Sequence, residues 1–226
     1  MKNGLVELNT QPWAAEREWT ADGIPVLHAV ATLPVRIRCK AACAAGSTGF
    51  TGCKPGVPAL LRAFSGSPGP GGVPECPGIQ RTLHPMEAEL TYQVTYNEGG
   101  LWSLYTQSRE AGAPAVRRGD TWDLATGYPV ALSAFFPAKT PWKRHLLALA
   151  ASELERRETA GVIRLREDWR RQLRRKFNPN HFYLTAEGIV LFYPVYTLSP
   201  SSIIPTILLP YGDTLLRPGR EKPSAV

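Results

Sequence analysis

The sequence lacks the features that would place the chain in a membrane or export it. None of its 226 residues lies in an uninterrupted apolar run of about 18 residues, the length that a membrane-spanning helix needs. The first residues, MKNGLVELNTQPW, show no basic stretch followed by an apolar one, which is the pattern of a secretory signal. The sequence therefore predicts a cytoplasmic chain with no membrane span.

Residues that carry chemistry are few and scattered. None of the four histidines (His28, His84, His145 and His181) lies in an H-E-x-x-H motif. The G-x-S-x-G motif and the glycine-rich phosphate-binding motifs are missing as well. Asp120 and Asp123 could form a pair of carboxylates, but the position of Asp123 before A-T-G favours a hydrogen bond to a turn. We expect no enzyme, no metal site and no cofactor.

The cysteines are also few. Cys39, Cys43, Cys53 and Cys76 follow the spacing C-x3-C-x9-C-x22-C. Four cysteines permit two disulfides in three pairings, or a zinc site of four thiolates. The second pair lacks the short spacing of zinc ribbons, and a chain without an export signal stays in a reducing compartment. Free thiols are therefore the favoured state.

Glycine and proline are abundant instead, with 20 Gly and 21 Pro. Of the 47 residues at 39–85, 16 are Gly or Pro, which predicts a long loop with Val57–Phe64 as a possible short helix. This composition divides the chain into five parts: a lead-in and first strand at 1–38, the Gly/Pro/Cys-rich insertion at 39–85, a hairpin subdomain at 86–140, a helix-and-strand subdomain at 141–216, and a flexible tail at 217–226.

Over the whole chain, 43% of the residues are apolar, which is the composition of a folded globular protein. Residues 1–22 show no clear period and are interpreted as a partly ordered lead-in. The expected strands are Gly23–Arg38, a hairpin at 89–109, Asp120–Leu124, a second hairpin within HFYLTAEGIVLFYPVY, and the run SIIPTILLP. We expect an α+β fold in which an antiparallel sheet of hairpins packs against a pair of helices.

Two helices are expected between the hairpins. The first has Thr140 as its N-cap and Pro141 as its first residue, and Gly161 ends it. The second runs from Val162 to Phe177 and carries apolar residues at every fourth position. The helix residues expected to pack on the sheet are Trp142, Leu146, Leu149, Trp169 and Leu173.

Positive charge is concentrated in the helices. The formal net charge is +7, and residues 143–176 hold eleven Lys or Arg against five Asp or Glu, a local excess of +6. Such a segment can attract nucleic acid or any other polyanion. It can equally be a solvated face with internal pairs such as Arg164 with Asp168. The absence of any nucleic-acid-binding motif favours the second interpretation.

The C-terminal part carries a resemblance to a known family. The stretch FYLTAEGIVLFYPVYTLSP, from Phe182 to Pro200, is followed by ILLPY at 207–211. It resembles the C-terminal module of the anti-sigma factor RsiV, which also occurs in the non-catalytic region of PdaC-type peptidoglycan deacetylases. The residues at the motif positions are Phe182, Leu184, Thr185, Gly188, Tyr196, Pro200, Pro210 and Tyr211. The upstream segments TYQVTYNEGGLWSLYTQS and TWDLATGYPVALSAFF resemble the companion domain, so the match covers roughly 87–216.

The resemblance implies a function that composition does not. It implies a non-catalytic binding or sensing module whose ligand is a cell-envelope component, either a lysozyme-like protein or a glycan such as peptidoglycan. It also implies an extracytoplasmic location, in contrast to the missing signal. The alternative is a basic protein associated with nucleic acid or with a sporulation structure. The candidate ligand-binding residues are Tyr193, Tyr196, Tyr211, Arg170 and Arg174, although the tyrosines are equally suited to core packing.

Overall fold

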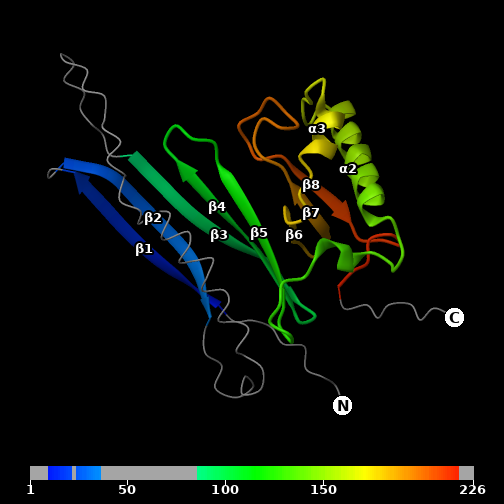
Figure 1. The fold of residues 1–226 in the computed structure, drawn as a ribbon, viewed down its shortest axis with the longest axis horizontal. Coiled ribbons are helices and arrows are strands. Elements are labelled where there is room, and N and C mark those ends of the chain that lie inside the picture. Colours follow the sequence, from blue (N-terminus) through cyan, green and yellow to red (C-terminus); the bar gives the residue numbers. More distant parts are fainter. Residues whose placement is uncertain (1–9, 22–23, 37–85, 219–226) are drawn as a thin grey trace.

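The computed structural model describes residues 10–21, 24–36 and 86–218 (Figure 1). The insertion expected at 39–85, with its four cysteines, lies outside the described residues, as do 1–9 and most of the expected tail. The described part is α+β, as the sequence predicts, and contains two sheets rather than one.

The larger sheet has five strands in the order of the chain. They are β1 (Thr10–Ala21), β2 (Ile24–Arg36), β3 (Met86–Glu98), β4 (Leu101–Glu110) and β5 (Val116–Asp123). The β3–β4 hairpin confirms the hairpin expected at 89–109. Asp123 also takes the expected turn role, because its Oδ1 accepts hydrogen bonds from the backbone N–H groups of Ala125 and Thr126, at 2.8 and 3.2 Å.

Two expectations for the N-terminal part are wrong. Residues 10–21 form β1, the edge strand of the sheet, instead of belonging to a partly ordered lead-in. The alternation of apolar and polar residues that marks a strand is hard to see here, because a charged residue, Arg17, occupies the same face as Trp13 and Trp19. The sheet is also not antiparallel throughout, since β2 and β3 pair in parallel from Leu27–Ala31 to Met86–Leu90.

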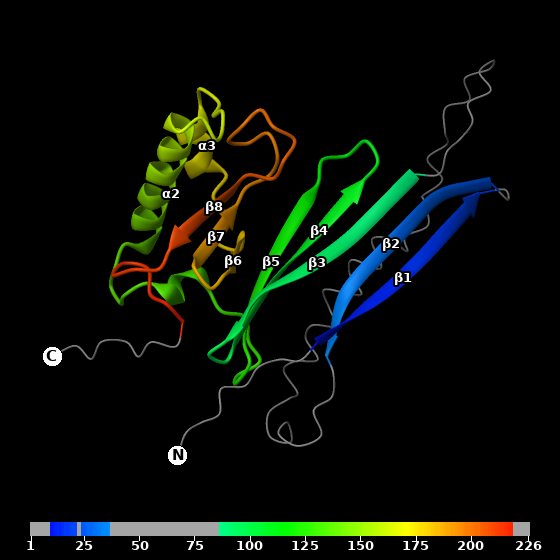
Figure 2. The ribbon, with the colours of Figure 1, turned by 180° about the vertical axis from the view of Figure 1, so that it is seen from behind.

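The smaller sheet is antiparallel and consists of β6 (Phe182–Leu184), β7 (Gly188–Phe192) and β8 (Thr206–Pro210), in that order. Before it in the chain lie a short 3-10 helix, η2 (Leu132–Phe135), and the helices α2 (Trp142–Thr159) and α3 (Trp169–Arg175). The helices cover the side of the smaller sheet that faces away from the larger sheet (Figures 1 and 2).

The helices differ from the sequence prediction at three points. The first begins at Trp142, with Pro141 at the N-cap and no side-chain cap. The second is much shorter than Val162–Phe177. The backbone N–H groups of Leu165 and Arg166 donate to the Glu158 carboxylate and the Leu198 carbonyl, so they are not available to a helix. Leu149 is 40% exposed instead of packing on the sheet, because it lies beside the buried face of α2.

The smaller sheet is buried on both faces. Its alternate residues contact the helices on one side, in a core that includes Leu146, Trp169 and Leu173. On the other side Tyr183, Val190 and Phe192 form a second cluster with Tyr105 of β4. Strands β6–β8 are therefore the central layer between α2–α3 and the end of the larger sheet.

The two sheets are joined by a buried hydrogen-bond network. Ser103 of β4 is fully buried, and its hydroxyl lies 2.8 Å from that of Thr121 on β5. The same Oγ accepts the backbone N–H of Leu184 at 2.9 Å. Strand β6 is an edge of its sheet, so the Leu184 N–H has no strand partner on that side. Ser103 satisfies a polar group that would otherwise be buried without a partner.

A glycine allows this close approach. Gly119 of β5 lies against the backbone of Phe182 on β6, and a Cβ at position 119 would collide with the Phe182 carbonyl. The backbones of β5 and β6 thus touch directly, which only a residue without a side chain permits.

We predict that Gly119→Ala separates the sheets and lowers the free energy of unfolding by about 1 to 3 kcal/mol, the usual cost of an added methyl group in a packed site. Gly212→Ala is the matched control, because a Cβ at position 212 meets nothing within 4 Å. Urea denaturation of both variants measures the difference. Equal stability of the two variants would contradict the close contact of β5 and β6.

A histidine links the three N-terminal strands. His28 of β2 bonds through Nε2 to Glu16 of β1 at 2.7 Å and through Nδ1 to Glu87 of β3 at 2.9 Å. The bond to Glu87, and to a smaller extent the bond to Glu16, raises the pKa of His28 above its ordinary value of 6.5. Both ring nitrogens can donate at once only in the imidazolium, so the bridge is complete only when His28 is protonated.

We predict that this bridge stabilises the protein at low pH and is lost as the pH rises through the raised pKa of His28. The stability difference between the wild type and His28→Gln should be largest near about pH 5 and should decrease as the pH rises through the raised pKa of His28. Urea denaturation at each pH measures it. His145→Gln, on the exposed surface of α2, is the control and should show no such trend. A difference that grows with pH would refute the bridge.

Candidate functional site

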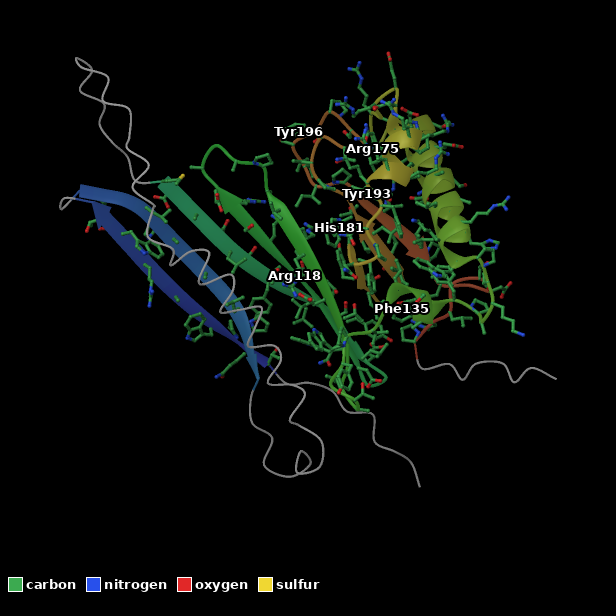
Figure 3. The ribbon with its side chains drawn as sticks, in the orientation of Figure 1. Arg118, Phe135, Arg175, His181, Tyr193 and Tyr196 are labelled. Carbon is green, nitrogen blue, oxygen red and sulfur yellow. The ribbon has the colours of Figure 1, made fainter. Side chains whose placement is uncertain are left out.

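The structure separates the five candidate ligand-binding residues into two groups. Arg170 and Arg174 lie on the exposed side of α3. The three tyrosines come from the strand region and do not gather at one place: Figure 3 shows Tyr193 close to α3 and Tyr196 on the loop that follows β7. The arginines and the tyrosines therefore need separate explanations.

Tyr193 is a buried residue that contacts α3. Its side chain is only 2% exposed, and its hydroxyl donates to the backbone carbonyl of Leu173 at 3.0 Å. Burial raises the pKa of the Tyr193 phenol, so the hydroxyl stays protonated and remains a donor. This contact fixes the C-terminal end of α3 on the smaller sheet, and it leaves Tyr193 with no surface to offer a ligand.

Tyr211 has a similar structural task at the turn between β6 and β7. Its hydroxyl donates to the carbonyl of Thr185 at 3.2 Å, and burial raises its pKa. In the same turn the Thr185 hydroxyl donates to the Gly188 carbonyl and accepts from the Gly188 N–H. Gly188 also lies so close to the backbone of Leu209 that a Cβ at position 188 would collide with the Leu209 carbonyl. The motif residues at this turn are thus explained by the fold.

Tyr196 is the exposed member of the three. It is 49% exposed and has a positive φ of 59°, an unfavourable conformation for a residue with a side chain. It lies in the loop between β7 and β8, and it does not line the groove described next.

The arginines belong to a groove between α2 and α3. It has a volume of about 780 Å³, within the usual range for ligand sites. The lining residues are Thr140, Pro141, Trp142, Lys143, Arg144, Leu147, Ala148, Ala151, Arg170, Leu173 and Arg174. The floor is therefore apolar, and the charged side chains that line the groove are all cationic.

Ion pairs neutralise much of the helical charge outside the groove. Glu153 binds both Arg156 and Arg157, and Asp168 binds Arg166 and Arg171. The pairing expected between Arg164 and Asp168 is replaced by these two contacts. Hydrogen bonds from the Gln172 amide and, with a smaller effect, from the Arg171 guanidinium lower the pKa of Asp168 to about 2, so this carboxylate stays charged.

The cations of the groove are less neutralised. Arg170 pairs with Glu155 at 2.9 Å and lies over the ring of Trp169, 4.6 Å from its centroid. Lys143, Arg144 and Arg174 form no ion pair within the described part of the chain. Lys143 lies 5.3 Å from the ring centroid of Phe177. The groove thus keeps positive charge that the fold does not use.

His181 is held near the junction of the two sheets. It stacks on Phe192 with ring centroids 5.0 Å apart, and burial lowers its pKa. Its Nδ1 is buried and has no hydrogen-bond partner among the described residues. His181 is thus a packed histidine beside the second core cluster, without a carboxylate of the described chain to orient its ring.

The structure also bears on the expectations for metal binding and for a membrane span. Within the residues that the structure describes, no group of three or more His, Cys, Asp or Glu side chains is placed to hold a metal ion. Among the described helices, none has the length and apolar character to cross a membrane.

Sequence reasoning missed the α2 side of the groove. The sequence predicts Lys143 and Arg144 only as part of a basic segment, and it does not single out Leu147, Ala148 or Ala151. Their spacing of three and four residues places Arg144, Leu147, Ala148 and Ala151 on neighbouring turns of one helix face, which is a usable signal. What the spacing does not reveal is that α3 packs beside this face.

Comparison with known proteins relates this fold to one family. Residues 133–212 match the model of a protein family of unknown function, DUF3298, and they include the whole groove. No curated protein was found to match the chain in sequence.

Two solved structures share the fold. The chain is similar to a DUF3298 family member from Bacteroides fragilis, with 16% identity, a TM-score of 0.54 and 90% of each chain covered. It is equally similar to a DUF3298 family protein from Pseudomonas aeruginosa, with 16% identity, a TM-score of 0.55, and coverage of 90% of this chain and 91% of that one. Residues 133–212 of this protein therefore match the DUF3298 family model, within a fold that the chain shares with these two proteins.

Proposed function

We propose that this protein is a non-catalytic binding module that takes a negatively charged ligand in the groove between α2 and α3. The observation that carries the proposal is the groove itself, because it combines an apolar floor with four cationic side chains (Lys143, Arg144, Arg170 and Arg174). Three of them, Lys143, Arg144 and Arg174, form no ion pair within the described residues, and such cations beside an apolar surface attract an anionic ligand and then bury part of it.

The resemblance to the RsiV and PdaC modules supplies the finer part of this proposal. It implies a ligand of the cell envelope, met on the extracytoplasmic side. Of the two ligand classes considered, peptidoglycan carries carboxylates that suit the groove. A lysozyme-like protein would have to present an acidic surface to it, because like charges across an interface are unfavourable.

Nucleic acid is the competing candidate. The eleven cations at 143–176 motivate it, but five of them (Arg156, Arg157, Arg166, Arg170 and Arg171) are held by carboxylates of the same fold. A binding module for a compact acidic ligand accounts better for the paired arginines.

We predict that the chain binds an acidic ligand, tested with soluble peptidoglycan fragments and with polyglutamate as probes, and that Arg174→Glu weakens the binding of such a probe about tenfold. Reversing a charge inside the groove adds repulsion to the loss of attraction. The matched control is Arg175→Glu, the neighbouring exposed arginine of α3, which does not line the groove. Fluorescence anisotropy with labelled ligands measures each affinity.

Polylysine, lysozyme and a short DNA duplex complete the panel of probes. The proposal is supported if acidic probes bind and only the groove variant weakens them. It is overturned if no acidic probe binds, or if both charge reversals have the same effect. Tighter binding of the duplex, with a steep loss of affinity in salt, would instead favour the nucleic-acid alternative.

A further inference from the structure

The groove also indicates what kind of ligand it takes. Resting on the function proposed above, we infer that the occupant is an acidic amphipathic helix of a partner protein, lying along α2 and α3. A glycan and a flexible acidic polymer can carry the same charge, and the shape and the apolar floor of the groove favour the helix over them.

The shape of the groove suits a helix. Its α2 side runs from Trp142 to Ala151, which corresponds to about 14 Å at 1.5 Å per residue, or two and a half turns. Its α3 side is formed by Arg170, Leu173 and Arg174. A groove between two packed helices is the usual receptor for the apolar face of a third, which inserts residues at i, i+3, i+4 and i+7.

The floor of the groove is apolar and includes small residues. Leu147, Ala148, Ala151 and Leu173 supply aliphatic surface, and the two alanines lie one turn apart on α2. Small side chains let a second helix approach to the 8–10 Å of ordinary helix packing. Partner leucines could fill the remaining space and gain about 1.5 to 3 kcal/mol each when fully buried.

The same floor disfavours a glycan. Thr140 and the indole N–H of Trp142 are the neutral hydrogen-bonding side-chain groups among the described lining residues. Sugar hydroxyls that are removed from water need hydrogen-bond partners, and an aliphatic floor leaves them unpaired at a cost of about 1 to 3 kcal/mol each. A helix has no such cost, because its backbone groups bond to one another.

The cations give the complementary charge. They lie on both sides of the floor, Lys143 and Arg144 on α2 and Arg170 and Arg174 on α3. A helix seated between them would meet cations along both of its flanks, so glutamates on either side of its apolar stripe would each face an opposite charge. Arg170 is already held by Trp169 and Glu155, which reduces the entropy lost on binding.

The experiment uses the full chain and three labelled peptides of about 15 residues, the shortest length at which an isolated helix has marginal stability. The first has leucines at i, i+3, i+4 and i+7 with glutamates elsewhere. The second has the same composition in scrambled order, and the third replaces every glutamate with lysine. Fluorescence anisotropy measures their affinities.

We predict that the amphipathic acidic peptide binds at least about tenfold more tightly than the scrambled one, and that the lysine peptide does not bind. Ala148→Trp fills the floor and should weaken the first peptide about tenfold. Ser152→Trp is the matched control, because Ser152 is another small exposed residue of α2 but does not line the groove. Circular dichroism confirms that both variants fold, and Arg174→Glu tests the site without adding a side chain to its floor.

The outcomes separate this inference from the proposed function. If polyglutamate or peptidoglycan fragments bind through Arg174 but the amphipathic peptide is no better than the scrambled one, the helical occupant is wrong and the acidic ligand stands. If Ala148→Trp and Ser152→Trp weaken the peptide equally, its binding lies outside the groove, which also overturns the inference. If no acidic probe binds, both proposals fail.

Discussion

The contact between β5 and β6 determines how the rest of the structure is arranged. Gly119 allows the two backbones to touch, and the Ser103 hydroxyl receives the edge N–H of Leu184 in a buried network. The smaller sheet is thereby fixed with one face against β4 and β5. Its other face remains for the helices, and the core residues on that face are fully buried only because both layers are present.

The groove is a consequence of this layering. The smaller sheet supports α2 and α3 side by side, and Tyr193 anchors the end of α3 through the carbonyl of Leu173. The buried faces of the helices are used by the core, so their outer faces are free to carry charge. Internal pairs such as Arg157 with Glu153 neutralise part of that charge, and three of the cations without such a pair, Lys143, Arg144 and Arg174, line the groove. The proposed binding role follows from this unused combination of charge and apolar surface.

Much of the fold could be predicted from local pattern. The alternation in ELTYQVTY and the turn at Asn97–Gly100 gave the β3–β4 hairpin, and Gly161, with a φ of 70°, ends α2 where expected. Errors arose where distant partners override local preference. Val162–Asp168 has a helical pattern, but Glu158 and Leu198 take its backbone N–H groups. Of the candidate site residues, Arg170 and Arg174 were found from charge, whereas their apolar companions on α2 were not.

Local pattern is enough to establish the α+β class, the order of the principal elements and the concentration of positive charge at 143–176, because hydrophobic period, turn residues and charge can be read from neighbouring residues. The fold in three dimensions is needed to learn which tyrosines are buried, which arginines are paired and that α3 lies beside Ala148 and Ala151. Those facts depend on contacts between residues far apart in the chain, such as Ser103 with Leu184, and a local pattern contains no record of them.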